Sequence, residues 1–169
     1  DRWKSYGTVY RLTTPGHLGA STAWTAGSTT FELTLRDKSM SISQDGNIVT
    51  FESSAVNLVA GDGNAAIDVF ARDRAAATTT RLSVDSAGDQ ANNTSQYAAV
   101  SGDGRVVAFE SRDENFPGAG DGGASDVFAF DRDSDTLECL TCGFLGFADA
   151  RADDIGGDGR LVLINGTQI

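Results

Sequence analysis

Hydrophobic and polar residues alternate over short stretches of this chain, and residues typical of turns separate the stretches. Four such stretches follow one another, at residues 39–43, 48–53, 68–73 and 78–83. A two-residue period rich in valine, threonine and phenylalanine is typical of half-buried β-strands. The Asp45-Gly46 pair favours a tight hairpin turn between the first two stretches. Since no stretch of any length has a helical period, the pattern predicts an all-β protein.

The four stretches occur a second time, at residues 96–101, 105–111, 126–131 and 137–141. Asp45 and Asp103 are 58 residues apart, and the phenylalanines and aspartates of the later stretches keep the same interval. A third copy opens at residues 157–163 with Gly-Asp-Gly-Arg-Leu-Val-Leu. Similarity at a fixed interval marks a repeat architecture, in which each unit buries its apolar face against a neighbour.

Four short strands in each repeat predict one blade of a β-propeller. A sandwich is the competing all-β architecture, but it does not require near-identical units at a fixed interval. We expect a partial propeller of about 2.5–3 blades, whereas closed single-chain propellers have about 4–8. The expected divisions are a degenerate or partial blade, two blades and the start of a further blade, at residues 1–38, 39–95, 96–152 and 153–169.

The N-terminal region fits the repeat less well than the rest of the chain. Residues 29–36 alternate and predict a strand, whereas the composition of residues 14–28 predicts a loop. The shortfall in blades suggests a fragment or subunit of a larger assembly. We expect protein partners or further blades to complete the ring.

Charge narrows the choice of partners. The chain has 24 acidic and 13 basic residues and a net charge of −11. This sign repels phosphate backbones, so we do not expect a nucleic acid partner. There is also no apolar run of the ~18 residues that a membrane-spanning helix needs.

Three motifs of the repeat resemble a known family. They are Ser101-Gly-Asp-Gly-Arg-Val-Val-Ala-Phe-Glu-Ser111, then Asp-Val-Phe-x-x-Asp at residues 68–73 and 126–131, then Arg-Leu-Ser at residues 81–83. Together they resemble the TolB-like β-propeller repeat of bacterial envelope and secreted proteins, over residues 39–164. The resemblance implies a propeller fold and a periplasmic, cell-surface or secreted location. It implies little about activity, because propellers host many functions.

The loop between the second and third strands is the best candidate ligand site. Asp62, Asn64 and Asp68 are closely spaced there, and Asp121 and Asp126 repeat the pattern without the asparagine. Ca²⁺ takes six to eight oxygen ligands, which such side chains and loop carbonyls supply. The alternative is structural, with the aspartates capping turns and binding backbone amides.

Cys139 and Cys142 are the only cysteines, and they form a C-x-x-C pair. A zinc site would need two further ligands, and the only histidine is the distant His17. We expect a local disulfide that staples a turn, which implies an oxidising compartment. Two free thiols or a redox site are the alternatives.

No catalytic constellation stands out in the sequence. A Ser–His–Asp triad would have to use His17, and there is no Gly-x-Ser-x-Gly motif. Glu52 and Glu110 occupy matched positions in the repeat, which suggests a structural feature of each blade. We therefore expect a non-catalytic protein-interaction scaffold. The alternatives are a Ca²⁺-supported module that binds glycan or peptide, and an accessory propeller of a hydrolase.

Overall fold

The computed structural model describes residues 22–26, 29–33, 40–119, 124–142 and 147–168 of the chain. Contacts divide the chain into two compact units, Asp1–Lys38 and Ser39–Ile169. In the first unit, β1 (Thr22–Ala26) pairs antiparallel with β2 (Thr29–Leu33). The prediction of a loop over residues 14–28 is therefore wrong for β1. The many small residues of this region led to the prediction of a loop, although Thr22, Trp24 and Thr25 favour a strand.

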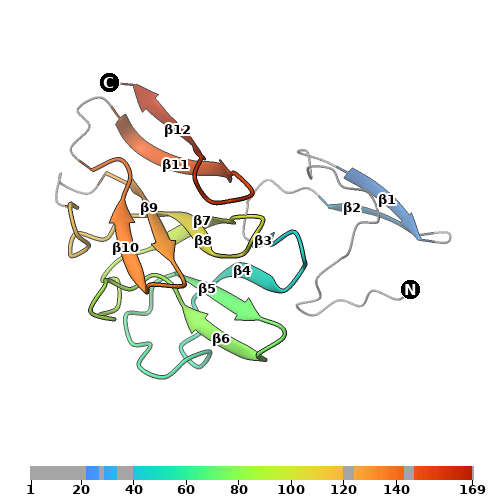
Figure 1. The fold of residues 1–169 in the computed structure, drawn as a ribbon, viewed down its shortest axis with the longest axis horizontal. Helices are drawn as coiled ribbons and strands as arrows, with labels where there is room; N and C mark the ends of the chain where they lie inside the picture. Colours follow the sequence, from blue (N-terminus) through green and yellow to red (C-terminus); the bar gives the residue numbers. More distant parts are fainter. Residues whose placement is uncertain (1–21, 27–28, 34–39, 120–123, 143–146, 169) are drawn as a thin grey trace. The chain divides into compact units, whose positions relative to one another are not determined.

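The second unit contains the repeated sheets (Figure 1). The first sheet has the order β3 (Met40–Ile42), β4 (Ile48–Ser53), β5 (Asp68–Asp73), β6 (Thr78–Arg81). The second has the order β7 (Ser95–Val100), β8 (Val106–Ser111), β9 (Asp126–Asp131), β10 (Thr136–Cys139). A third sheet pairs β11 (Phe147–Ile155) with β12 (Val162–Gln168). Neighbouring strands in all three sheets are antiparallel.

The sheets stack face to face in chain order, and the core lies between them. Strand β7 packs against β3 and β4 of the first sheet, and β11 packs against β7 and β8 of the second. One apolar cluster joins the first two sheets, for example through Leu82, Phe109 and Phe128. Another joins the second sheet to the third, for example through Val127 and Ala152. These sheets are blades of a partial β-propeller, because each successive sheet buries its face against the next.

Three phenylalanines of the second blade pack at the first interface. Phe109 of β8 and Phe128 of β9 are paired across the strands, with ring centroids 6.2 Å apart. Phe116 meets the Phe128 ring edge-on at 5.1 Å. All three side chains are buried, and a buried aromatic side chain stabilises a fold by about 3–5 kcal/mol relative to alanine. These three phenylalanines therefore contribute much of the packing energy at the first interface.

The Asp-Gly turns of the second and third blades touch the blade before them. In the second blade, Ser101 Oγ donates to Asp103 Oδ1 at 2.5 Å and accepts from the Val106 amide at 2.9 Å. Gly104 follows with φ +78°, which glycine adopts readily and other residues rarely do. A Cβ atom on Gly104 would lie 2.8 Å from Cγ1 of Ile48 in the first blade. The turn of the second blade is therefore in close van der Waals contact with the first blade.

Backbone hydrogen bonds also cross from blade to blade. The amide of Ser95 in β7 donates to the carbonyl of Ile67, which precedes β5, at 2.8 Å. The amide of Ala150 in β11 donates in the same way to the carbonyl of Ser125 at 3.1 Å. A repeated bond of this kind fixes the stagger of each blade on the preceding one.

The third unit starts earlier than the sequence predicts. Its first strand, β11, begins at Phe147, ahead of the expected start of this unit at residue 153.

The described residues contain no helix that is both long and apolar enough to cross a membrane.

Candidate functional site

The long loop of the first blade gathers its predicted ligand residues around one glutamine. Nε2 of Gln90 lies 3.1 Å from Asp62 Oδ1 and 3.3 Å from Asp68 Oδ2. Its Oε1 accepts the amide of Gly63 at 3.2 Å. Asn64 also donates to the Ala91 carbonyl at 2.9 Å and accepts the Ala66 amide at 2.9 Å. Gln90 thus links the loop to the connection between the blades.

Asp68 is the buried member of this group. It is fully buried and accepts a 2.5 Å hydrogen bond from Ser83 Oγ. Burial raises the pKa of Asp68 above the ordinary 3.8, against the opposing effects of the hydrogen bonds from Ser83 and Asn64. The charged form of this carboxylate therefore lowers the stability of the folded state, although its oxygens are well supplied with donors.

A guanidinium group adjoins the same loop. Nη1 of Arg81 lies 3.7 Å from Asp62 Oδ1, and these two side chains are only 9% and 3% exposed. Nη2 of Arg81 lies 3.5 Å from the carbonyl oxygen of Gly61. The structure thus brings Asp62 and Asp68 together, with donors from the protein itself on both. Ca²⁺ binding by Asp62, Asn64 and Asp68 stays a prediction.

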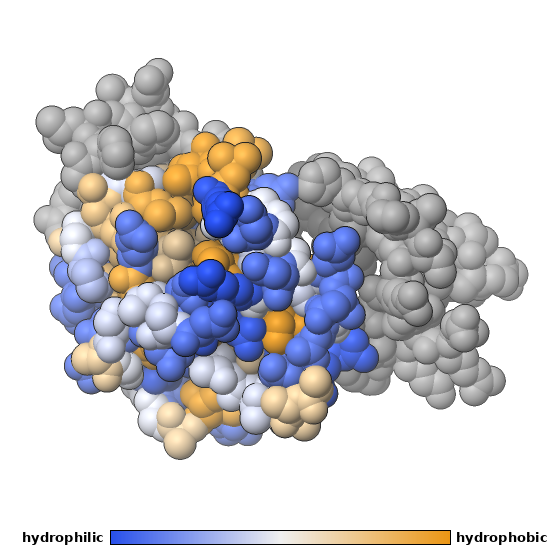
Figure 2. Space-filling model, viewed as in Figure 1, coloured by the Kyte–Doolittle hydropathy of each residue, from blue (hydrophilic) through white to orange (hydrophobic). Residues whose placement is uncertain are grey.

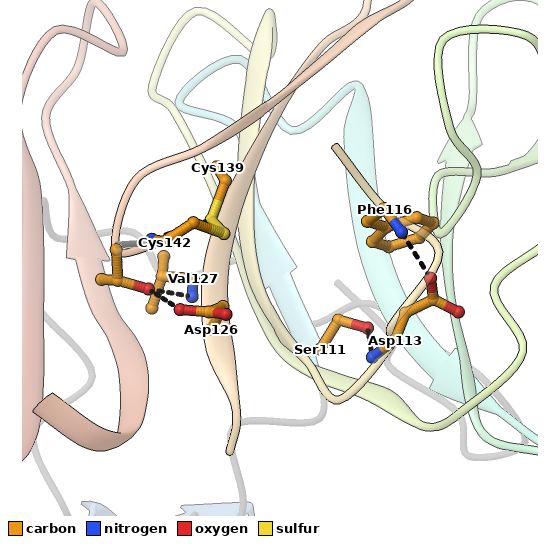
Figure 3. The surroundings of a disulfide bond; sticks show 8 residues. Ser111, Asp113, Phe116, Asp126, Val127, Cys139 and Cys142 are labelled. Carbon is orange, nitrogen blue, oxygen red and sulfur yellow. Dashed lines mark hydrogen bonds between the residues drawn. A yellow bond between two sulfur atoms is a disulfide. The ribbon is translucent and has the colours of Figure 1, made fainter. Parts of the chain in front are cut away.

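The second blade repeats the buried aspartate (Figure 3). Asp126 accepts from Thr141 Oγ1 at 2.7 Å, and this hydroxyl oxygen accepts the Val127 amide at 2.9 Å. Asp68, Ser83 and the Val69 amide make the same arrangement in the first blade. In each blade the buried aspartate thus accepts from a side-chain hydroxyl, and this hydroxyl accepts a backbone amide. Asp121, the other predicted ligand in this blade, lies outside the described residues.

Cys139 and Cys142 form the predicted disulfide, beside Asp126 (Figure 3). Cys139 is 58 residues after Arg81, so the disulfide stands where the first blade has its buried guanidinium. The loop of the second blade packs on it, because a Cβ atom on Gly118 would lie 3.2 Å from Cys142 Cβ. The two blades therefore anchor equivalent loops by different chemistry, an ion pair in one and a covalent bond in the other.

A second group of polar residues lies where β4 and β8 meet the first strands of the following blades. We call Glu52, Gln96, Tyr97, Glu110 and Arg151 the first-strand cluster. The Tyr97 backbone has φ +56° beside a bulge between Gln96 and Ala99. Its amide donates to Glu52 Oε1 of the preceding blade at 2.5 Å. A non-glycine residue at positive φ costs about 1–3 kcal/mol and persists only where its surroundings hold it.

The guanidinium of Arg151, in the next blade, lies over the aromatic ring of Tyr97. Cζ of Arg151 in β11 lies 3.8 Å from the ring centroid, within the range of a cation–π interaction. Nε of Arg151 is buried and has no hydrogen-bond partner among the described residues. Glu110 is 4% exposed, and Gln96 Nε2 donates to it at 3.3 Å. Burial raises the pKa of Glu110, while the charge of Arg151 opposes this rise.

Sequence reasoning singled out Glu52 and Glu110 but missed their neighbours. The bulge places Tyr97 opposite Glu52, and nothing in the two-residue alternation reveals a bulge. Arg151 stands 55 residues after Gln96, the interval that separates Asp158 from Asp103, so aligning the third copy could have found it. Gln90 lies in the polar connection between blades and belongs to no motif. His17, the only candidate base for a triad, lies outside the described residues.

The known proteins to which this chain is similar share its fold alone. No protein-family model matches the chain, and no curated protein matches it. Its fold is similar to TolB from Acinetobacter baumannii, with a TM-score of 0.48 and 15% identity over 83% of this chain and 30% of that one. It is similar also to the tricorn protease, with a TM-score of 0.44 and 13% identity over 77% of this chain and 11% of that one. The chain thus spans less than a third of the length of either protein, and its similarity to them is one of fold alone.

Proposed function

We propose that this chain is a non-catalytic β-propeller module that binds a protein through the first-strand cluster. The observation that carries the proposal is the buried Nε of Arg151, which has no partner among the described residues although its guanidinium is stacked on Tyr97. A donor left unsatisfied in this way costs about 1–3 kcal/mol, more when it is charged. Arg151 as a whole is only partly buried, and a ligand acceptor at its guanidinium would offset this cost.

The chemistry of the cluster favours a polypeptide ligand. A guanidinium group presents a planar array of donors that matches a carboxylate or a backbone carbonyl. The cluster is also ordered before a ligand arrives, since Glu52 holds the Tyr97 backbone and Tyr97 holds Arg151. Preorganisation lowers the entropic cost of binding. Tyrosine and arginine are, in addition, common among the residues that contribute most to protein interfaces.

The proposed setting is a larger assembly outside the cytoplasm, in which other polypeptide completes the ring. The Cys139–Cys142 disulfide supports this setting, because disulfides persist mainly in oxidising compartments. The partial propeller supports the need for further blades or partners, because propellers avoid open edges by closing into a ring.

The test is selection of a ligand from random twelve-residue peptides displayed on phage, with the wild-type chain as bait. Selected peptides are then measured by calorimetry against wild type, Arg151→Lys and Tyr97→Ala. We expect Arg151→Lys to weaken binding about tenfold, since lysine keeps the charge and loses the planar fork. Tyr97→Ala should weaken binding similarly, because it removes the ring on which the guanidinium rests.

A matched control is Arg74→Lys, because Arg74 lies on an exposed turn of the first blade and donates to the Gly46 carbonyl. This variant should bind the selected peptides as wild type does. The proposal is wrong if no peptide is selected, or if every selected peptide binds the Arg151→Lys and Tyr97→Ala variants with unchanged affinity.

A further inference from the structure

The disulfide of the second blade lies beside a buried carboxylate (Figure 3). A carboxylate oxygen of Asp126 and the Sγ atoms of Cys139 and Cys142 all lie within 4.8 Å of one another. Asp126 is 7% exposed, whereas both cysteines are only partly buried. A reductant in solution can therefore reach the sulfur atoms, and the two thiols that it produces would lie together with the carboxylate.

Two thiolates and a carboxylate are a ligand set that suits Zn²⁺. Zinc binds cysteine sulfur at about 2.3 Å and carboxylate oxygen at about 2.0–2.2 Å, in tetrahedral geometry. Ligand atoms at these distances are roughly 3.5–3.8 Å apart, so small side-chain movements suffice once the S–S bond is broken. Ca²⁺ and Mg²⁺ prefer oxygen ligands alone. The structure thus adds a third ligand to the two in the C-x-x-C pair, and water can take the fourth position.

Hydrogen bonds already orient two of these three ligands. Thr141 Oγ1 donates to Asp126 Oδ1 at 2.7 Å and so holds the carboxylate in place. The amide of Cys142 donates to Cys139 Sγ at 3.0 Å. A hydrogen bond to an ionised acceptor is stronger than one to a neutral acceptor, so this amide stabilises a thiolate. Partners of this kind orient metal ligands and strengthen metal binding.

The first blade has a positive charge at the equivalent position. Cys139 is the counterpart of Arg81, and Asp126 is the counterpart of Asp68. The charge of Arg81 favours the ionised form of Asp68. In the second blade an uncharged disulfide replaces this guanidinium. A bound Zn²⁺ would place a positive charge beside Asp126, as Arg81 does beside Asp68.

We infer that the reduced Cys139–Cys142 pair and Asp126 form a zinc site, so that the disulfide and the zinc complex are alternative states of the chain. A dithiol reductant supplies two electrons and two protons: the S–S bond breaks, two thiols form, and the reductant becomes a disulfide. Zn²⁺ then displaces both thiol protons into solvent and binds the two thiolates and the carboxylate. This site is separate from the first-strand cluster and does not depend on the proposed function.

The zinc complex would take over the structural role of the disulfide. The ion would join Asp126, at the start of β9, to Cys139, at the end of β10, and to Cys142. The loop that contains Gly118 packs on the same two cysteines, since a Cβ atom there would lie 3.2 Å from Cys142 Cβ. We therefore expect Zn²⁺ to raise the melting temperature of the reduced chain and to leave that of the oxidised chain unchanged.

The charge of the chain decides how zinc binding has to be measured. The net charge is −11, and hydrophilic residues cover much of the described surface on the face shown in Figure 2. Such a surface attracts divalent cations without a specific site. Zn²⁺ is therefore titrated by calorimetry in an excess of Mg²⁺, which favours oxygen ligands and leaves the thiolates free. A phosphine keeps the chain reduced, because a thiol reductant would itself bind zinc.

We expect one Zn²⁺ to bind each reduced chain and none to bind the oxidised chain under these conditions. Replacing Cys139 and Cys142 by serine should abolish binding. Asp126→Asn should weaken it at least about tenfold, since even the partners of metal ligands contribute that much. Asp68→Asn is the matched control, because Asp68 is also buried and also accepts a hydroxyl hydrogen bond. It should bind zinc as wild type does, and circular dichroism checks that each variant is folded.

X-ray absorption at the zinc edge tests the ligand set in the wild-type chain, without any substitution. We expect two sulfur ligands at about 2.3 Å and oxygen ligands at about 2.0–2.2 Å. The inference is overturned if the reduced chain binds no zinc, if the oxidised chain binds it equally well, or if Asp126→Asn and Asp68→Asn have the same affinity. Four sulfur ligands would also overturn it, because two chains would then share the ion without Asp126.

Discussion

Gly104→Ala tests the packing of one blade on the next, and Gly46→Ala is its matched control. Both glycines occupy the same position of the Asp-Gly turn, with φ +78° and +73°. An alanine at either site adopts a left-handed backbone conformation, which costs about 1–2 kcal/mol. Both substitutions lower the entropy of the unfolded chain equally, so this effect cancels in the comparison.

The two sites differ in what the added methyl group meets. At Gly104 it would lie 2.8 Å from Ile48 Cγ1 of the first blade, whereas at Gly46 the nearest atom is Arg74 Nη1 at 3.7 Å. Forcing atoms into a packed core costs about 1–3 kcal/mol. We therefore expect a loss of about 2–5 kcal/mol for Gly104→Ala and about 1–2 kcal/mol for Gly46→Ala.

The assay is urea unfolding followed by far-ultraviolet circular dichroism, with the free energy of unfolding extrapolated to water. Gly159→Ala should resemble Gly104→Ala, because its methyl group would lie 2.7 Å from Val106 Cγ2 at the next interface. Equal losses for Gly104→Ala and Gly46→Ala would refute the contact between turn and blade, and with it the stacking of the sheets.

Three further predictions concern the buried carboxylate, the disulfide and the calcium hypothesis. Burial raises the pKa of Asp68 in the folded state. The protonated carboxyl group therefore stabilises the folded state fully below pH 3.8, and this stabilisation is lost as the pH rises through the pKa of the folded state. Asp68→Asn should therefore gain stability relative to wild type over that range in urea titrations, and a pH-independent difference would contradict this. Replacing Cys139 and Cys142 by serine should cost roughly 2 kcal/mol, as the loop-closure relation gives for a short loop. A reductant should lower the melting temperature of wild type to that of the variant and leave the variant unchanged. On the calcium hypothesis, 1 mM CaCl₂ raises the melting temperature of wild type and not of Asp62→Asn, and an unchanged wild-type value removes the hypothesis.

The sequence predicts the parts of this fold that depend on local chemistry. Alternation and the Asp45-Gly46 turn are properties of a few neighbouring residues, and β4 and β5 lie at their predicted positions. β11 was harder to predict, since irregularities between Ala148 and Arg151 and between Ala152 and Asp154 interrupt its alternation. Its strand begins at Phe147, before the expected unit boundary.

The first-strand cluster depends on contacts between blades, which no local pattern encodes. Glu52 belongs to one blade, Tyr97 to the next and Arg151 to the third, so their meeting requires the stagger of the stacked sheets. The internal repeat predicts that the blades stack, but not how far one is shifted along another. For the same reason Gln90, which links Asp62 and Asp68, could be assigned no role from the sequence alone.

Hydrogen exchange of four amides tests the stacking of the blades most directly. The amides of Gln44, Ser95, Asp103 and Ala150 donate to carbonyls of another blade, at 2.8, 2.8, 2.8 and 3.1 Å. If the blades stack as described, these four amides exchange as slowly as those inside β4 and β8. If they exchange at the rate of an unstructured peptide while β4 and β8 stay protected, the sheets form without stacking and the account is wrong.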